Sequence, residues 1–393
     1  MSQKRKILVL GGGFGGIKAA LELSAHSAFS VTLISDQDNF RYYPMLYRTA
    51  TGGSQVASEI PLSETLAGKQ IKLVKDGALS LDRVAKKVKG SSGKAYSYDA
   101  LVVALGVVTN FFGIKGLDKY AYGIKTQEDS RRLREHLHKL LIEKQKPDIN
   151  YVVIGGGPTG VELAGALPGY IRYIMRRHNL ADRPIHVDLV EAAPRLVPRM
   201  PQQYSRAIEK RLRQLSVSLH LSEKVLAETA DKLMVTGHSI DSHSVVWTAG
   251  VTNHPFLKDN DFALSENGRA QVDNYLRATE NIYVIGDNAD TQYSGMAQTA
   301  LYDGKFVAED LKRQSDGKKR RSYSAKKPIY IIAVGPHWAA VLWGRARIYG
   351  WGGWLLRNLA DFAGYHEYEP WWKAGRRLEA TFQNEETCEI CKR

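Results

Sequence analysis

The feature that most constrains this chain is a strand-like apolar run followed directly by closely spaced glycines. Residues 6–10 read Lys-Ile-Leu-Val-Leu and run into Gly11, Gly13 and Gly16. This G-x-G-x-x-G spacing allows a tight turn, close approach of a pyrophosphate and close packing of the next helix on the strand. A helix expected over residues 17–23 would direct its N-terminal amides at the phosphates.

The same pattern occurs a second time. Residues 151–154 form another apolar run, which is followed by Gly155, Gly157 and Gly160. Two strand–turn–helix units in one chain predict two dinucleotide sites. We therefore expect an α/β fold with two Rossmann-like three-layer dinucleotide-binding domains.

An acidic residue after the second strand of each unit would bind the ribose hydroxyls. In the first unit Ser35 precedes Asp36, so Asp36 is the candidate, with a surface turn as the alternative. In the second unit Glu191 ends a strand and favours NAD over NADP. Arg195 and Arg199 follow closely and leave a 2′-phosphate open as the alternative.

Three further stretches have the character of nucleotide-binding segments. Residues 281–285 form an apolar strand that ends in Gly286-Asp287, where the aspartate would bind a ribityl or ribose hydroxyl or only cap the strand. Residues 39–47 are rich in aromatics and form either a wall against a flat cofactor ring or a loop over the core. Residues 71–106 read as a small antiparallel meander that ends at Gly106.

The last 80 residues differ from the rest. Eight Lys and Arg residues fall between residues 312 and 327, six of the seven tryptophans follow, and the whole chain carries a net charge of +14. Ile348, Trp351, Leu355, Leu359 and Phe362 share one helical face, which suits a helix in the headgroup region of acidic lipid. A tryptophan-rich dimer interface or a cap on the core is the alternative, and nucleic acid is a poorer fit because no nucleic-acid module appears. No apolar run reaches the ~20 residues that span a bilayer.

Cysteine usage excludes several kinds of chemistry. The two cysteines are Cys388 and Cys391, so residues 1–387 contain no thiol. This argues for a reducing compartment and against a disulfide framework or a thiol relay. One C-x-x-C pair does not complete a four-ligand zinc site, and we expect no metal.

Together these motifs resemble the flavin-dependent type II NADH:quinone oxidoreductases, which belong to the two-dinucleotide-binding (pyridine nucleotide-disulfide oxidoreductase) flavoproteins. The resemblance runs over about residues 6–310. It is carried by residues 11–16, 42–47, 109–114, 155–165, 247–251 and 286–287.

The resemblance implies FAD in the first domain and NADH in the second, which is inserted into the first, with the two cradles facing each other. The expected domains are 1–112 with 252–310 for FAD, 113–251 for NADH, and 311–393 as a C-terminal segment for the membrane surface or dimerisation. The cofactor-binding residues that it implies are Gly11, Gly13, Phe14, Gly15, Gly16, Asp36, Pro44, Tyr47, Ala104, Gly106, Gly286, Asp287, Ala297, Gln298, Gly155, Gly157, Thr159, Gly160, Glu191 and Gly250.

Two residues are implied in catalysis. Glu162 follows the second glycine turn, where it would poise the nicotinamide or relay a proton towards quinone, or else only complement the helix dipole. Gln298 belongs to a run near the quinone in the family. Tyr302 stands where that run has a second glutamine, and Ser35 stands where the family usually has an acid.

The expected activity is transfer of two electrons from NADH through FAD to a membrane quinone, without proton pumping. The expected location is peripheral, on the cytoplasmic face of the cell membrane. One alternative is a soluble flavoprotein reductase of a ferredoxin-like carrier, which the basic segment 318–327 would dock. Others are an NADH-sensing protein and a nucleotide-binding scaffold without flavin.

Overall fold

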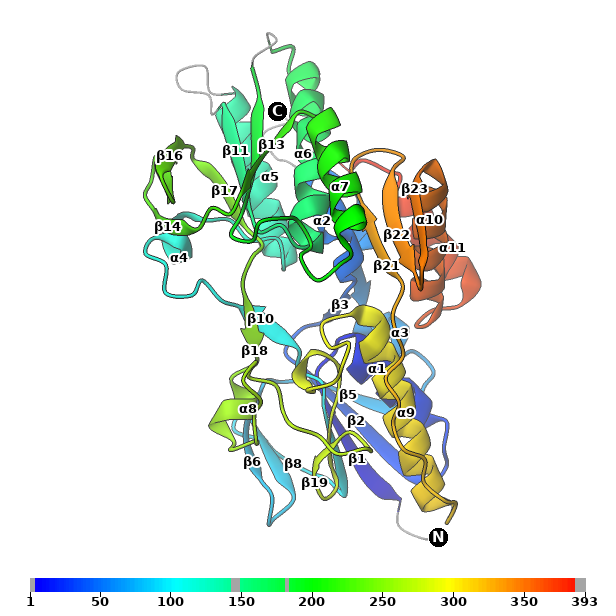
Figure 1. Ribbon diagram of the computed structural model, residues 1–393. Coiled ribbons are helices and arrows are strands. Elements are labelled where there is room, and N and C mark those ends of the chain that lie inside the picture. Colours follow the sequence, from blue (N-terminus) through cyan, green and yellow to red (C-terminus); the bar gives the residue numbers. More distant parts are fainter. Residues whose placement is uncertain (1–3, 143–148, 181–183, 386–393) are drawn as a thin grey trace. The chain divides into compact units, whose positions relative to one another are not determined.

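The computed structural model describes residues 4–142, 149–180 and 184–385 (Figure 1). These form two compact units. The first unit contains residues 4–41, 60–109 and 251–328, and the second contains the described parts of 42–59, 110–250 and 329–385. The chain thus passes into the second unit at residues 42–59, 110–250 and 329–385, and it returns to the first unit after each of the first two of these segments.

The first unit is built on a six-stranded sheet in the order β19-β20-β9-β1-β2-β5. Neighbouring strands from β20 to β5 pair in parallel, and β19 pairs antiparallel at one edge. The strands are β1 (Arg5–Leu10), β2 (Phe29–Ser35), β5 (Ile71–Lys75), β9 (Ala100–Val103), β19 (Arg277–Thr279) and β20 (Ile282–Val284).

Both faces of this sheet are covered, which is why the apolar run that opens the chain is continuous rather than alternating. Helix α1 (Phe14–Ser24) connects β1 to β2 and packs along α9 (Ala297–Ser315), as Figure 1 shows. On the other face Leu8, Leu10 and Val103 form a core with Val88 and Tyr98. This layer comes from an antiparallel sheet of β6 (Ala78–Asp82), β7 (Lys87–Gly90) and β8 (Ala95–Ser97).

The meander predicted over residues 71–106 is therefore correct only in its middle part. Residues 71–75 form β5, which pairs in parallel with β2 as an edge strand. An edge strand is half exposed, so its apolar and polar residues alternate as they do in an antiparallel strand.

The second unit repeats the plan with a four-stranded parallel sheet in the order β13-β12-β11-β17. Three helices bury one face, and an antiparallel three-stranded sheet buries the other. The sheet strands are β11 (Asn150–Ile154), β12 (His186–Glu191), β13 (Val217–Leu221) and β17 (Ser244–Trp247). The helices are α5 (Gln127–Ile142), α6 (Pro158–Arg177) and α7 (Gln202–Gln214), and the small sheet is β14 (Val225–Glu228), β15 (Lys232–Val235) and β16 (His238–Asp241).

Residues 329–385 belong to this second unit rather than forming a body of their own. An antiparallel sheet leads into two helices, and the buried side chains of the sheet join the same core as α6. The elements are β21 (Tyr330–Ala333), β22 (Ala339–Trp343), β23 (Ala346–Gly350), α10 (Trp351–His366) and α11 (Trp371–Ala380). Ile348 therefore lies in a strand and not on the helix where the sequence placed it.

The remaining elements are short. They are β3 (Asn39–Arg41), β4 (Glu59–Pro61), β10 (Val107–Thr109), β18 (Val251–Asn253), α2 (Leu46–Ala50), α3 (Leu62–Thr65), α4 (Leu117–Tyr120), α8 (Phe256–Asp259) and the 3-10 turns Tyr43–Met45, Gln55–Ala57 and Gly286–Asn288. Among the helices that the structure describes, none has both the length and the apolar character needed to cross a membrane.

Candidate functional site

The first glycine turn follows β1 and opens α1 in the way the spacing predicts. Gly11 has a φ of +107°, and a Cβ on it would collide with the carbonyl of Ala104 at the end of β9. A Cβ on Gly16 would collide with the carbonyl of Gly11, so both positions require glycine. Around Gly13, by contrast, no atom lies within 4 Å of a built Cβ. The turn is closed on two sides and open where a phosphate would approach the helix N-terminus.

Two side chains that the sequence analysis missed organise the strand ends beside this turn. The amide group of Asn288 donates to the carbonyl of Gly106 at 2.7 Å and accepts the N–H of Gly106 at 2.7 Å. Asp303 accepts the N–H of Gly286 at 3.0 Å and the hydroxyl of Tyr323 at 2.6 Å. Burial raises the pKa of the Asp303 carboxyl to about 6. These bonds hold Gly106 and Gly286 in place at the carboxyl ends of the neighbouring strands β9 and β20.

The other predicted residues of the first unit occupy different environments. The Phe14 ring is buried edge-on against Phe40 at 4.9 Å, so its side chain is part of the core. Asp36 and Gln298 are exposed and Asp287 is half-buried. Ala297 opens helix α9. Close packing of α9 on α1 comes from Gly15 and Gly304, since a Cβ on Gly304 would collide with the Gly15 backbone.

The second glycine turn repeats the first. Gly155 has a φ of +111°, and a Cβ on Gly160 would collide with the carbonyl of Gly155. Gly157 again has no atom within 4 Å of a built Cβ. Thr159 is exposed in the first turn of α6, and Gly250 is buried against the carbonyl of Asn110.

Glu191 lies at the end of β12 and binds the second turn directly. Its carboxylate accepts the N–H of Gly156 at 2.6 Å and the N–H of Ala193 at 2.7 Å. A carboxylate offers about four acceptor positions, so two remain for hydroxyl groups. The guanidinium of Arg195 is occupied differently, because it donates to the carbonyl of Met200 at 2.6 Å and to Ser205 at 3.0 Å.

Glu162 lies on α6 and forms part of a buried charge cluster that the sequence analysis did not anticipate. Arg357 of α10 donates to Glu162 at 2.5 Å and to Asp361 at 2.8 Å. It also donates to the carbonyl of Pro44 at 2.7 Å. The three charged side chains are each less than 10% exposed. We call Glu162, Arg357 and Asp361 the charge triad.

One guanidinium thus faces two carboxyl groups inside the protein. Loss of hydration raises the pKa of both Glu162 and Asp361, and the charge of Arg357 opposes that rise. Burial also raises the pKa of nearby Tyr47 to about 12. Because a guanidinium keeps its proton, the triad is neutral only when one carboxyl group is protonated.

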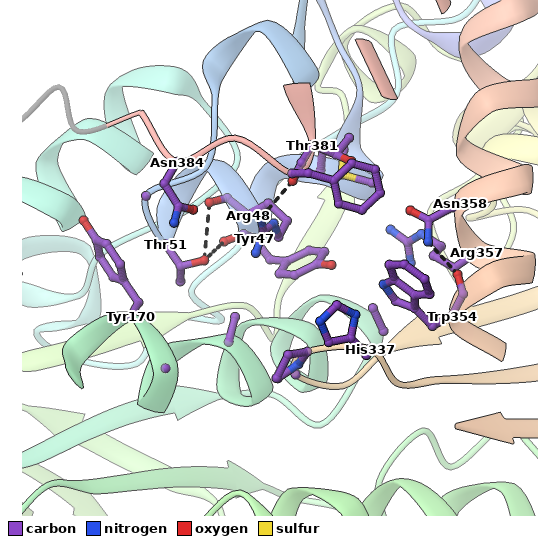
Figure 2. Close-up of a pocket in the computed structure, with 18 of the residues that line it drawn as sticks. Tyr47, Arg48, Thr51, Tyr170, His337, Trp354, Arg357, Asn358, Thr381 and Asn384 are labelled. Carbon is purple, nitrogen blue, oxygen red and sulfur yellow. Dashed lines mark hydrogen bonds between the residues drawn. The ribbon is translucent and has the colours of Figure 1, made fainter. Parts of the chain in front are cut away.

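A pocket of about 380 Å³ lies beside the triad, within the range of small-molecule sites. Figure 2 shows Tyr47, His337 and Trp354 around one space, with Arg357 next to them. The rings of His337 and Trp354 meet edge to face at 5.0 Å. The other residues that line the pocket include Met45, Thr51, Gly52, Ala166, Tyr170, Ala333, Asn358 and Phe382. The wall is mainly aromatic and apolar, with polar groups at a few positions.

The structure therefore brings Pro44, Tyr47 and Glu162 together around Arg357. Within the aromatic stretch 39–47, Tyr47 lines the pocket, whereas Phe40 and Tyr42 are buried in the core. Tyr42 is buried and stacks on Tyr365 at 4.3 Å, and its hydroxyl donates to Asp361 at 3.3 Å.

Helices α10 and α11 present an apolar surface to the outside. Trp351 is 64% exposed, Leu359 56% and Trp371 66%, whereas Arg357 and Asp361 of α10 face inward. This reverses the usual arrangement of an amphipathic helix on a soluble protein. The exposed set, which we call the apolar face, consists of Trp343, Trp351, Leu355, Leu359, Trp371, Trp372 and Phe382.

The basic segment 312–327 is largely paired with acids of the first unit. The pairs are Lys312 with Glu22, Arg313 and Arg321 with Glu309, Lys318 with Asp316, and Arg320 with Asp310. Tyr302 lies half-buried under Lys326, whose ammonium is 4.3 Å from the ring centre. Cys388 and Cys391 lie outside the described residues.

Comparison with known proteins places these features in context. Residues 5–304 match the model of the family described as pyridine nucleotide-disulphide oxidoreductase. A type II NADH:quinone oxidoreductase of Staphylococcus haemolyticus is 26% identical over 368 residues, covering 87% of this chain and 90% of that protein. Its counterpart in Staphylococcus aureus is 26% identical over 358 residues, covering 85% and 88%. The structure of NDH2 from Plasmodium falciparum in complex with NADH has the same fold, with a TM-score of 0.87 at 18% identity over 97% of this chain and 98% of that one.

Proposed function

Since the chain belongs to the pyridine nucleotide-disulphide oxidoreductase family, we propose that it is a flavin-dependent NADH dehydrogenase that reduces a membrane quinone. The observation that carries this proposal is the pair of glycine turns. Each is closed by backbone contacts at its outer glycines and open at the middle one, Gly13 or Gly157.

The residues of both turns fit a dinucleotide. A pyrophosphate requires bare backbone at the helix N-terminus, and the space around Gly13 and Gly157 provides it. We assign FAD to the first turn, where Gly106 and Gly286 are held at the strand ends next to Asp287. FAD, when bound, would supply the chemistry of accepting a hydride and passing on two electrons. The protein binds and orients it.

We assign NADH to the second turn because of Glu191. This carboxylate is already oriented by two backbone N–H groups, and its free acceptor positions suit the two ribose hydroxyls. A 2′-phosphate would meet a negative charge there. Arg195, the nearby candidate for binding that phosphate, is held by carbonyl groups instead.

The pocket beside the charge triad is our candidate for the quinone head group. A quinone ring is flat and apolar with two carbonyl oxygens. Tyr47, His337 and Trp354 offer flat surfaces, and the phenol of Tyr47 offers a hydrogen-bond donor.

Reduction of a quinone to a quinol consumes two protons, and the triad offers places to hold one. One guanidinium lies between two buried carboxyl groups whose pKa values burial raises, so the carboxyl oxygens of Glu162 and Asp361 are the atoms that would hold this proton. We propose that Glu162 passes this proton towards the pocket.

The apolar face supports the membrane part of the proposal. Exposed tryptophans near arginines are typical of surfaces that insert into the headgroup region. The carrier-protein alternative needs a free basic patch, and five of the eight Lys and Arg residues in segment 312–327 already pair with acids.

The decisive experiment is anaerobic mixing of the purified yellow protein with NADH, followed by a short-chain quinone. We expect the flavin absorbance to bleach with NADH and to return with quinone. Bleaching without recovery would exclude quinone as acceptor, and a colourless protein would refute the flavin assignment.

A Glu191→Arg variant separates the two nucleotide assignments. It should raise the KM for NADH while the protein remains yellow, because the Glu191 carboxylate binds the second glycine turn at Gly156. An exposed control, Glu266→Arg, should change neither property. Loss of flavin in Glu191→Arg would contradict the assignment of the two sites.

A further inference from the structure

Three side chains of the second unit converge although nothing in their spacing marks them as a motif. His220 lies on β13, Glu223 follows that strand, and His238 lies on β16 of the small sheet. One ligand atom from each lies within 4.8 Å of the other two. None of the three lines the pocket described above, and the backbone N–H of Glu223 donates to the carbonyl of Glu191 at 3.1 Å.

The distances between the candidate ligand atoms are close to those between the ligand atoms of a tetrahedral metal site. His220 Nδ1 is 3.6 Å from one oxygen of Glu223, and His238 Nδ1 is 3.7 Å from the other. Zn²⁺ binds His nitrogen and carboxylate oxygen at about 2.0–2.2 Å in a tetrahedron, which places neighbouring ligand atoms roughly 3.3–3.5 Å apart. Small side-chain movements therefore suffice.

A fourth residue orients the first histidine. Asp188 accepts a hydrogen bond from His220 Nε2 at 3.0 Å. A ligating histidine typically donates its other ring N–H to a carboxylate, which directs the free nitrogen at the metal. Here Asp188 holds Nε2, so Nδ1 is the nitrogen that points towards Glu223.

The carboxylate of Glu223 also has an oxygen that accepts no hydrogen bond from the described residues. This oxygen, Oε2, is buried, and the imidazole Nδ1 of His238 lies 3.7 Å from it. A buried acceptor without a donor is costly unless a cation or water satisfies it. The opening of the site at exposed His238 leaves a fourth position for water.

We propose that His220, Glu223 and His238 bind a divalent transition-metal ion, with Zn²⁺ as the best match, and that Asp188 is the positioning residue. Two histidines and one glutamate form a ligand set that zinc uses with an open fourth position. The ion would link β13 of the parallel sheet to β16 of the small sheet. A plain network of histidine–carboxylate pairs is the competing explanation.

The test uses untagged full-length protein with FAD bound and both Cys388 and Cys391 replaced by serine, so that no thiol can bind metal. Titration with Co²⁺ should give the visible absorption of a tetrahedral ion at one equivalent, and Zn²⁺ should abolish it. Calorimetry with Zn²⁺ should give one site. His238→Gln and Glu223→Gln should each weaken Zn²⁺ binding at least about tenfold, and Asp188→Asn about 10–100-fold.

The matched control is His243→Gln. His243 is an exposed histidine of the same unit, and it pairs with the carboxylate of Asp231 at 3.0 Å. Its replacement should leave Zn²⁺ affinity unchanged. Metal-free unfolding curves of all variants check that the unit still folds. Absence of a one-equivalent Co²⁺ signal, or equal Zn²⁺ affinity in His238→Gln and the parent, would overturn the proposal.

Discussion

Removing the guanidinium of Arg357 should destabilise the second unit strongly, and only at pH values where its partners are ionised. The Arg357→Met variant keeps most of the side-chain volume but leaves Glu162 and Asp361 buried without a counter-charge. Breaking a buried ion pair by removing one partner costs about 3–5 kcal/mol. Two carboxyl groups depend on this one cation, so we expect the upper end of that range near neutral pH.

The pH dependence follows from the direction of the carboxyl pKa values. Burial raises both above their ordinary values of 4.5 and 3.8, and loss of Arg357 removes the charge that opposes this rise. A carboxyl group whose pKa is higher in the folded state binds a proton on folding. Its contribution to stability is therefore complete below its unfolded pKa and is lost as pH rises. The variant should approach the parent at acidic pH and fall behind above about pH 4.5.

Tryptophan fluorescence measures this unit selectively, because all seven tryptophans, from Trp247 to Trp372, lie in it. Urea unfolding followed by this signal at several pH values gives the difference in free energy of unfolding. Arg376→Met, on the exposed side of α11, is the matched control and should cost under about 0.5 kcal/mol. A triple variant with Glu162→Gln and Asp361→Asn should recover much of the loss. Equal stability of Arg357→Met and the parent at neutral pH, or a loss that does not change with pH, would refute the reasoning.

Three further predictions concern other parts of the second unit. Burial raises the pKa of Glu228 to about 8, so the folded protein binds this proton more tightly than the unfolded chain does. The free energy of unfolding should therefore fall as pH rises from 4.5 through about 8. Glu228→Gln should remove this pH dependence in urea unfolding monitored by tryptophan fluorescence. Gly157→Ala should fold normally but bind NADH weakly, whereas Gly160→Ala should unfold more easily because its Cβ meets the Gly155 carbonyl; paired NADH titrations and unfolding curves distinguish the two. Trp351→Ser should weaken flotation with acidic liposomes by roughly tenfold, since burying a large apolar side chain contributes on the order of 1.5–3 kcal/mol, and equal flotation of variant and parent would contradict the lipid-binding role of the apolar face.

Most of the fold could be predicted from patterns of residues close together in the sequence. The α/β class with Rossmann-like domains was predicted from two glycine turns, and the family resemblance was predicted from these turns together with four further motifs; both are confirmed. These features were readable because each turn is encoded within about ten residues. Gly11 and Gly155 both adopt a positive φ at the start of these turns.

Contacts between distant residues were not readable. Glu162 and Arg357 are separated by 195 positions, so no periodicity connects them. The apolar periodicity of α10 was visible, and the sequence favoured an outward, lipid-facing apolar side, which the structure exposes. The inward position of Arg357 was not readable, because its partners lie elsewhere in the chain. The strand at residues 71–75 was misread for a related reason, since half exposure at an edge imitates antiparallel alternation.

Asn288 and Asp303 illustrate a third limit. Each side chain supports a glycine backbone at a strand end, at Gly106 and Gly286 respectively. Asn288 closely follows Gly286-Asp287, a pattern that drew attention to the aspartate alone. Asp303 lies on a helix, where a carboxylate ordinarily indicates a solvated surface.

The inward-facing arginine of α10 has a mechanical consequence. Because its guanidinium bonds to Glu162, a buried ion pair joins α10, which carries Trp351 and Trp354, to α6, which begins at the second glycine turn. A surface that binds α10 therefore also fixes the distance and orientation of α6 relative to that surface. The C-terminal part is then a rigid portion of the nucleotide-binding unit and not a flexible tether between that unit and the surface.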